Sequence, residues 1–525
     1  MWKHALAGAL LLAAGCAPKT LAPDPGLFAL QQAVVAAGRA EARVLDGCYK
    51  CLLEARDTYT SLLDGPLAES VRPRLFEAAL LVTLREKELA LPFESSLTRA
   101  KAAAEGLPEY FSADRLLAIV EAIPPEVAGW GVLPVQEFTR ARSTFAMRSA
   151  GEVAWVATSA LQPAVRTYLS LAVVCAEIPG PFRDQRAVLP TPEDPPLVAY
   201  RRATCRNRQS AEKLQELRVS VPDFTELAYF LMRTQADRLI LGTNWQEFRG
   251  LLGTSLDALP DSPAVTYVAG RGRQLLGSCP QALALYDRTI ELTPRHEDAW
   301  LGKTMCLSFL GQREASIGAA TTLLALKSEA YARDAYYWRA ANHHQLKNLA
   351  AARSDIDNAK RRGATIEIAT LAGIIEYEQD ALEEARRDLR AAQRMSDLAC
   401  APTWYLGLVH IKAGEWPDAG SAFEKAVSCY RQSVLDATSK LNGLADNSTV
   451  DPDYKRQQVA ALQAAIVEYT RQQRASAINA AMCLTNAGDL SRNDLLLAIA
   501  AEDPDLAPEI ERLRTHIKAY YTNRQ

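Results

Sequence analysis

One pattern occurs five times between Pro263 and Tyr430. Each copy has a small residue midway along a helix, a turn, an Ala early in the next helix, and a bulky residue four positions after that Ala. The early alanines follow one another about 34 residues apart, which is the length of two short antiparallel helices. They are Ala282, Ala315, Ala352, Ala385 and Ala419. Because one such unit cannot bury its apolar face alone, the pattern predicts an all-α fold, a solenoid of stacked antiparallel helix pairs.

The residue types of the pattern have a physical reason. A small residue in the first helix faces the early Ala of the second, so the two backbones approach closely, and the bulky residue fills the space beside them. The clearest copy has Gly407 and Phe423 in these places. Glycines at Gly277, Gly311 and Gly414 fall in the turns, where positive φ is often required.

These residues resemble the tetratricopeptide repeat (TPR) family. The resemblance implies a right-handed superhelix whose concave groove binds peptides or folded proteins. Two copies depart from the family pattern: the second is one residue short in its turn and has Thr322 or Leu323 where a late Ala is expected, and the third has Asn348 in place of the turn Gly. A generic array of helical hairpins stays open as an alternative, and it too is an α-solenoid.

The N-terminus indicates export. An apolar run, Ala5–Ala14, follows a short basic start and is too short to cross a bilayer, so it is typical of a signal peptide. Residues 12–16 resemble the lipobox of bacterial lipoproteins, which implies that Cys16 is lipidated and becomes the first residue of the mature chain. Ala17, where an Asp favours inner-membrane retention, implies the outer membrane, with the protein facing the periplasm. An ordinary secretory signal with a chance Cys is the alternative.

Composition limits the possible partners. The chain has 525 residues, of which 23% are charged, with a net charge of −3 and no block of Lys and Arg. Nucleic-acid binding depends mainly on neutralising phosphates, so this balance argues against it. Alternation typical of strands is scarce.

We expect six segments along the chain. They are a signal peptide at 1–15, a tether at 16–26, degenerate helical hairpins at 27–124, an irregular helical region at 125–221 with a Pro-rich loop at 179–196, the TPR-like solenoid at 222–430, and a C-terminal part at 431–525 with long helices, a weak sixth repeat and a capping helix. Within the irregular region, one helix is expected over Glu152–Ala176.

Disulfides can persist in an exported protein. Three candidate pairs follow from the expected helix ends and from the Pro-rich loop: Cys400 with Cys429, Cys279 with Cys306, and Cys175 with Cys205. Cys483 is then left free.

The sequence Cys48–Cys51 has the spacing of redox and metal motifs but lacks their other residues. We interpret it as two packing thiols or a local disulfide.

Catalytic motifs are absent from the sequence. It has no His-Glu-x-x-His, Gly-x-Ser-x-Gly or P-loop segment, and His343 and His410 fall where the repeat family carries packing residues. We expect no enzyme activity, no metal and no cofactor.

The repeat register predicts which side chains line the concave face. They are Tyr267, Arg271, Leu301, Tyr337, His344, Tyr377, Trp404 and Lys412. Aromatic and charged side chains suit a protein-binding groove, and Trp404 and Tyr337 are the expected anchors, although several of the set could instead pack between helices.

Two functions fit these features. The first is a lipoprotein scaffold for protein–protein interactions in an envelope assembly, in secretion, export or outer-membrane biogenesis. The second is a solute- or glycan-capture lipoprotein associated with a transporter.

Overall fold

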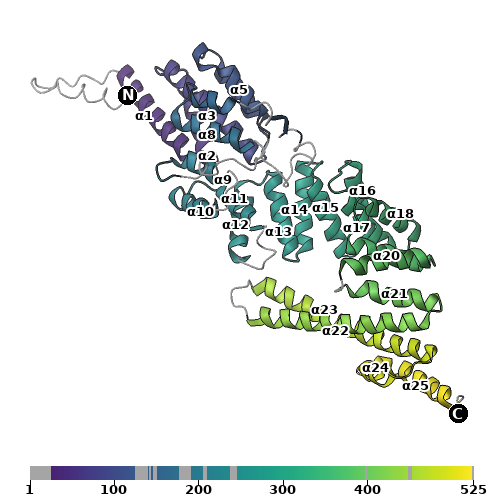
Figure 1. Ribbon diagram of the computed structural model, residues 1–525. Coiled ribbons are helices and arrows are strands. Elements are labelled where there is room, and N and C mark those ends of the chain that lie inside the picture. Colours follow the sequence, from purple (N-terminus) through teal and green to yellow (C-terminus); the bar gives the residue numbers. More distant parts are fainter. Residues whose placement is uncertain are drawn as a thin grey trace, which may run out of the picture. The chain divides into compact units, whose positions relative to one another are not determined.

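The computed structural model describes residues 25–124, 140, 143–145, 151–176, 191–204, 210–236, 245–396, 399–446 and 452–522, and within these ranges every regular element is a helix (Figure 1). The chain divides into two compact units. Unit 1 comprises 1–87, 92–123 and 147–224; unit 2 comprises 88–91, 124–146 and 225–525.

Unit 1 contains the helices that precede the repeats. They are α1 (Pro25–Asp46), α2 (Tyr49–Ser61), α3 (Ala68–Glu88), α4 (Glu94–Ala104), α5 (Ala113–Ala122), α7 (Glu152–Ala157), α8 (Pro163–Ala176), α9 (Pro196–Thr204) and α10 (Ser210–Ser220). The single helix expected over Glu152–Ala176 is wrong, because the structure has α7 and α8 there. Pro163 has no N–H to donate and disfavours helical backbone in the residue before it, so it can only begin a new helix.

Buried charge and close backbone contact hold unit 1 together. Gly47 turns α1 into α2 with φ 71°, and a Cβ there would lie 2.5 Å from Cα of Leu197 on α9. Arg85 of α3 is fully buried, with its guanidinium 3.8 Å from the centre of the Tyr200 ring and 5.4 Å from that of Phe224. Aromatic faces attract a cation most strongly where water is excluded, so this packing compensates part of the desolvation of Arg85.

Unit 2 contains the repeats and the C-terminal helices. They are α11 (Leu227–Ala236), α12 (Trp245–Ala258), α13 (Pro263–Leu275), α14 (Cys279–Leu292), α15 (Glu297–Phe309), α16 (Arg313–Ala325), α17 (Ala332–Gln345), α18 (Leu349–Arg361), α19 (Ile366–Glu378), α20 (Leu382–Met395), α21 (Cys400–Lys412), α22 (Trp416–Asp446), α23 (Pro452–Ala487), α24 (Asn493–Ala500) and α25 (Ala507–Thr522). From α13 to α22 each helix packs on the next, which makes five antiparallel pairs stacked as an all-α, TPR-like solenoid.

Small residues face large ones within the pairs, as predicted. A Cβ on Gly407 would lie 2.7 Å from the Phe423 ring, and one on Gly373 would lie 2.5 Å from Cγ of Leu389. Neither distance is possible for real atoms, so the helices of these pairs can meet only because glycine is present.

The five turns share one backbone device. Each contains a residue with φ between 60° and 76°. These residues are Gly277, Gly311, Lys347, Asp380 and Gly414. The third turn therefore keeps the left-handed conformation without glycine, and the Asn348 side chain caps α18 by accepting a hydrogen bond from the Ala351 N–H at 3.3 Å.

The second copy differs from its sequence-based alignment. Ala315 is exposed, and the buried small residue is Ser316, which follows Gly311 at the same interval as Ala282 follows Gly277. The turn is therefore not short. The Ser316 hydroxyl donates to the Thr304 carbonyl at 2.8 Å, so a polar residue fills the Ala position without an unsatisfied group.

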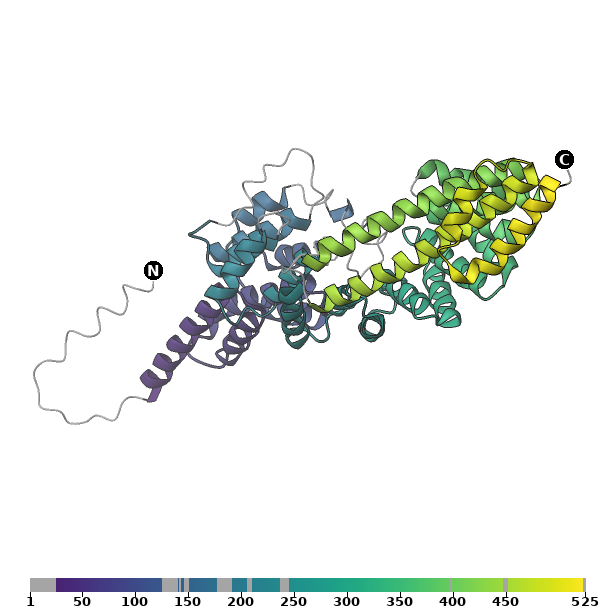
Figure 2. The same ribbon diagram turned by 90° about the horizontal axis from the view of Figure 1, so that it is seen from below.

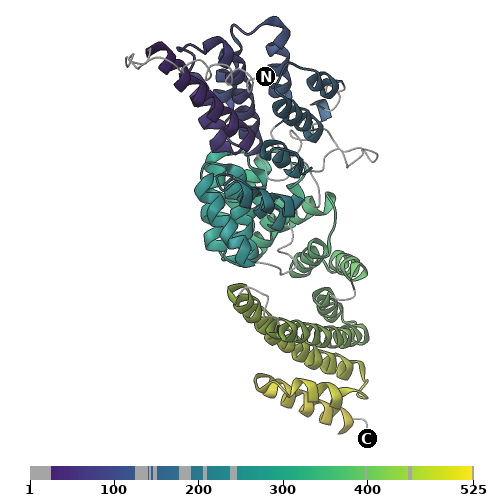
Figure 3. The same cartoon turned by 90° about the vertical axis from the view of Figure 1, so that its left-hand side faces the viewer.

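The last pair leads into a long hairpin. Helices α22 and α23 run side by side far beyond the length of the other pairs (Figure 2), and α24 and α25 pack on the C-terminal end of α23 (Figure 3). Gln457, near the start of α23, reaches the turn between α13 and α14, where its Oε1 lies 2.7 Å from the position of a Cβ on Gly277. No described helix is long and apolar enough to cross a membrane.

Candidate functional site

The first helices of the pairs form a continuous surface. Helix α13 contacts α15, α15 contacts α17, α17 contacts α19, and α19 contacts α21. We call this surface the inner wall. The eight predicted groove residues all belong to these five helices.

Three of the predicted residues come together on successive helices of the inner wall. His344 of α17 contacts Glu378 of α19, Nε2 to Oε1, at 3.1 Å. Lys412 of α21 lies with Nζ 4.2 Å from the centre of the Tyr377 ring and donates to the Tyr377 carbonyl at 3.1 Å. Its ammonium also pairs with Asp380 at 2.5 Å. The cluster combines an aromatic face with charges of both signs.

Tyr405 extends this cluster and was not predicted. Its ring meets that of Tyr377 edge to face, with centres 6.1 Å apart, and meets that of Trp404 at 5.0 Å. Burial raises the pKa of the Tyr405 hydroxyl, and the negative charge of Glu378 raises it further. The phenol therefore stays a neutral hydrogen-bonding group on this wall.

Tyr267 does not line an open groove. It is 4% exposed, and its ring is covered by His296 at 4.9 Å and Tyr286 at 6.0 Å between centres. The assignment of Tyr267 to the groove is therefore wrong: its position on the first helix is that of a groove residue, but two neighbouring rings enclose it.

Trp404 is attached to the core on one side. Its ring packs edge to face on Phe423 at 6.3 Å, and its indole Nε1 is buried without a hydrogen-bond partner. An anchor for a partner usually offers its N–H to that partner. The half-buried ring of Trp404 thus contributes to the stability of the last repeat as well as to the wall.

Tyr337 lies in a separate aromatic group. Its ring contacts that of Trp338 at 5.4 Å, and Trp338 contacts Phe309 of α15 at 5.3 Å. Phe309 is 64% exposed, which is high for a large apolar side chain. Phe309 and Trp338 were missed because they fall outside the family's groove positions, and Phe309 could have been recognised as an apolar residue in the last turn of a helix.

A carboxylate marks the N-terminal part of the wall. Asp298 of α15 accepts a hydrogen bond from the Tyr331 hydroxyl at 2.5 Å. Burial raises the pKa of Asp298 to about 6, while the Tyr331 hydrogen bond and the charge of Arg271 act in the opposite direction. Leu301, one turn later on α15, is half-buried. Arg271 and Asp298 thus place charges of both signs at this end of the wall.

Two of the candidate cysteine pairs can be compared with the structure. Cys400 and Cys429 form a disulfide with their Cα atoms 5.5 Å apart, at one end of the α21–α22 pair. Cys279 and Cys306 do not: both are buried free thiols. Burial raises the pKa of the Cys306 thiol, and a hydrogen bond with the neighbouring Cys279 thiol raises it further. The two thiols therefore contact each other without a covalent bond.

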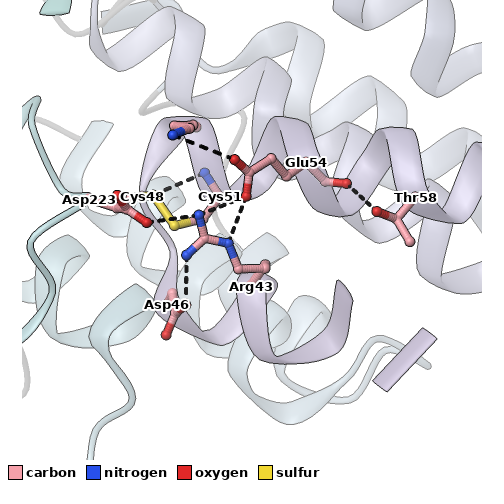
Figure 4. Close-up of polar contacts among 8 residues, drawn as sticks. Arg43, Asp46, Cys48, Cys51, Glu54, Thr58 and Asp223 are labelled. Atoms are coloured by element: carbon pink, nitrogen blue, oxygen red, sulfur yellow. Dashed lines mark hydrogen bonds and ion pairs between the residues drawn. A yellow bond between two sulfur atoms is a disulfide. The ribbon is translucent and has the colours of Figure 1, made fainter. Parts of the chain in front are cut away.

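Cys48 and Cys51 form a local disulfide at the start of α2 (Figure 4). Both residues are fully buried, and the Cys51 N–H donates to Sγ of Cys48 at 2.9 Å. Arg43 lies beside them and pairs with Glu54 at 2.7 Å and with Asp223 at 3.0 Å. A buried disulfide is inaccessible to an attacking thiolate, so this pair has a structural role: it fixes the N-cap residue Cys48 to the first turn of α2.

One group of side chains has the spacing of metal ligands. His410, Glu415 and Asp418 bring ligand atoms within 4.8 Å of one another. However, His410 Nδ1 bonds to Glu415 at 2.5 Å, and the Arg386 guanidinium donates to both oxygens of the same carboxylate at 3.0 Å. The hydrogen bond from His410 and then that from Arg386 lower the pKa of Glu415. The negative charge of the Glu415 carboxylate is already balanced by the Arg386 guanidinium, so these three residues make a poor cation site.

Two predicted sites involve residues outside the described part of the chain. Cys16 and the tether precede residue 25, and Cys205 falls in the interval 205–209. Cys175 is disulfide-bonded, and its pairing with Cys205 stays a prediction.

No protein-family model matches this sequence, and no curated protein is significantly similar to it. Solved structures of tetratricopeptide repeat proteins share low similarity. One from Parabacteroides merdae is 14% identical, with 52% of this chain and 98% of that chain covered and a TM-score of 0.34. The type IV pilus biogenesis factor PilW is 18% identical, with 41% and 92% covered and a TM-score of 0.30. YrrB, a TPR protein with an unusual peptide-binding site, is 15% identical, with 36% and 97% covered and a TM-score of 0.31. TM-scores this low support no conclusion about this chain beyond the helix pairs described above.

Proposed function

We propose that unit 2 is a protein-interaction scaffold that binds a segment of another protein along the inner wall. We further propose that a lipid on Cys16 holds the chain at the outer membrane of a bacterium, facing the periplasm, where it serves an envelope assembly in secretion, export or outer-membrane biogenesis. The kind of surface that the solenoid presents supports a binding role.

One observation carries the binding role: the cluster of His344, Tyr377 and Lys412, extended by Tyr405, spans three successive first helices. Rings of this kind give large contact area with few rotatable bonds. Lys412 and Asp380 are exposed enough to orient a polar partner segment. A continuous strip of such residues suits an extended or helical peptide better than it suits a small solute.

Photo-crosslinking in cells tests the groove. A photoreactive benzoylphenylalanine in place of Tyr377 should yield a discrete adduct with a partner protein, whereas the same residue in place of Tyr110, which is 72% exposed in unit 1, should not. Lys412→Glu should weaken the adduct from position 377, because it reverses the charge beside the ring. Equal adducts from both positions, or none from 377, would exclude the inner wall as the binding surface.

The membrane anchor has its own test. Cys16→Ser removes the thiol that would be acylated, and an acyl chain contributes about 0.8 kcal/mol per buried methylene. The variant should leave the outer-membrane fraction and become extractable without detergent. If it sediments with outer membranes as the wild type does, the anchor is not at Cys16.

A further inference from the structure

Helix α1 exposes much apolar surface, most of it near its start. Residues 25–38, about two-thirds of this helix of 22 residues, include no charged side chain. Among the described residues fourteen large apolar side chains are exposed, and five of them belong to α1. These five, which we call the α1 face, are Leu27, Phe28, Leu30, Val35 and Leu45, and Leu27 is 67% exposed. Exposed apolar side chains gathered on one element mark an interaction surface.

The other side of the same helix is buried in unit 1. Ala33 and Ala40 are at most 7% exposed, and α1 packs on α2 and α9. On an ideal helix Leu27, Phe28 and Val35 lie within about 100° of one another, on the side opposite these two alanines. Helix α1 therefore has two apolar sides, and its packing in unit 1 buries one of them.

The lengths of the helices explain why the start of α1 is uncovered. Helix α2 follows α1 after the turn at Gly47 and has 13 residues against the 22 of α1. At a rise of 1.5 Å per residue α1 is about 33 Å long and α2 about 20 Å, so α1 extends about 13 Å past α2. Figure 2 shows the first turns of α1 extending past the other helices of unit 1. Leu27, Phe28 and Leu30 lie on these turns.

We propose that the α1 face lies in the surface of the phospholipid bilayer that holds the chain. The proposal rests on the lipid proposed for Cys16, which precedes the first residue of α1 by nine positions. Nine residues reach at most about 30 Å when fully extended. The bilayer is therefore always present near the α1 face at a high effective concentration, whereas a soluble protein partner is not.

The composition of α1 fits a helix that lies on the bilayer. The uncharged residues 25–38 are fewer than the about 20 needed to cross the hydrocarbon core, and exposed charges follow them at Arg39 and Glu41. An interfacial helix instead buries its apolar side chains at the boundary between headgroups and acyl chains. This second contact fixes unit 1 against the membrane, which acyl chains at the end of a tether cannot do.

Sedimentation with vesicles of phosphatidylethanolamine and phosphatidylglycerol tests the α1 face without the lipid. The protein is the mature chain, residues 16–525, with Cys16→Ser, so that no acyl chain is present. It should bind the vesicles reversibly, and equally at low and high salt, since the contact is apolar. The double variant Leu27→Ser with Phe28→Ser should bind at least about tenfold more weakly, because each buried apolar side chain contributes to the affinity.

Tyr110→Ser with Val219→Ser is the matched control. These two side chains are 72% and 76% exposed and lie elsewhere in unit 1, so their replacement should leave vesicle binding unchanged. All four substituted positions are exposed, and both double variants should therefore unfold at the same urea concentration as the unsubstituted chain.

A loss of vesicle binding confined to the Leu27 and Phe28 variant supports the proposal. Absence of binding by the unacylated chain, or an equal loss in the control, would overturn it. A chain that is dimeric in solution, and monomeric in the Leu27 and Phe28 variant with unchanged vesicle binding, would also overturn it, because the α1 face would then bind a second copy. The lipid on Cys16 is tested separately by fractionation of cells, since these vesicle assays contain no acyl chain and reversible binding by α1 alone does not survive washing.

Discussion

The disulfide between Cys400 and Cys429 should contribute a large part of the stability of the last repeat. The two residues are 29 positions apart. On the chain-entropy model, a loop of this length removes about 12 cal/mol/K from the unfolded state, which is about 3.6 kcal/mol at 25 °C. The double substitution Cys400→Ala with Cys429→Ala also withdraws sulfur from the cluster around Ala426 and Tyr430. That packing loss adds about 1 kcal/mol.

Urea unfolding followed by tryptophan fluorescence measures this loss, since Trp404, one of eight tryptophans in the chain, packs on the same cluster and contributes to the signal. Cys483→Ala is the matched control. Cys483 is a buried free cysteine, so its substitution removes sulfur without removing a crosslink. We expect the control to lose about 1 kcal/mol and the double variant to lose about 4–5 kcal/mol. The slope of the free energy of unfolding against urea concentration should rise only in the double variant, because its unfolded chain is no longer held by the crosslink and exposes more surface.

Two results would refute the reasoning. If the double variant and the control differ by less than about 1 kcal/mol, the crosslink does not stabilise the repeat. Thiol titration of the denatured, unreduced protein gives the second result: the double variant should show the same number of free thiols as the wild type, and a loss of two would mean that the bond does not form.

Three further predictions concern unit 2, each read by urea unfolding. Gly373→Ala should destabilise by about 1–3 kcal/mol because its Cβ would overlap Leu389, whereas Gly318→Ala, with nothing within 4 Å, should stabilise by about 0.5–1 kcal/mol; equal effects would contradict the close packing. Since burial raises the pKa of Asp298 to about 6, the folded chain holds a proton that the unfolded chain releases between about pH 4 and pH 6, and this group's contribution to stability falls as the pH rises through that window. Asp298→Asn should remove the decline and add up to about 2 kcal/mol at pH 7, and an unchanged pH profile would contradict it. Trp404→Ala should lower the free energy of unfolding by about 2–3 kcal/mol, which is below the range for a fully buried Trp. An unchanged stability would instead mean that the ring serves only to contact a partner.

The repeat could be read from the sequence because its small and large residues recur at a fixed spacing. The alignment was wrong at Ser316 because the second copy reverses the usual sizes. Ala320 and Leu323 are both fully buried there, in the places that carry bulky and small residues in the other copies. A polar Ser at the small position is tolerated only because Asn342 donates to its hydroxyl at 3.0 Å, and Asn342 belongs to the next pair. A pattern within one copy contains no information about that partner.

The sequence could predict which helices and positions make up the inner wall, but it could not predict which of those side chains are exposed. Tyr267 and Trp404 lie on first helices of their pairs at groove positions, yet His296 covers one ring and the other leans on Phe423.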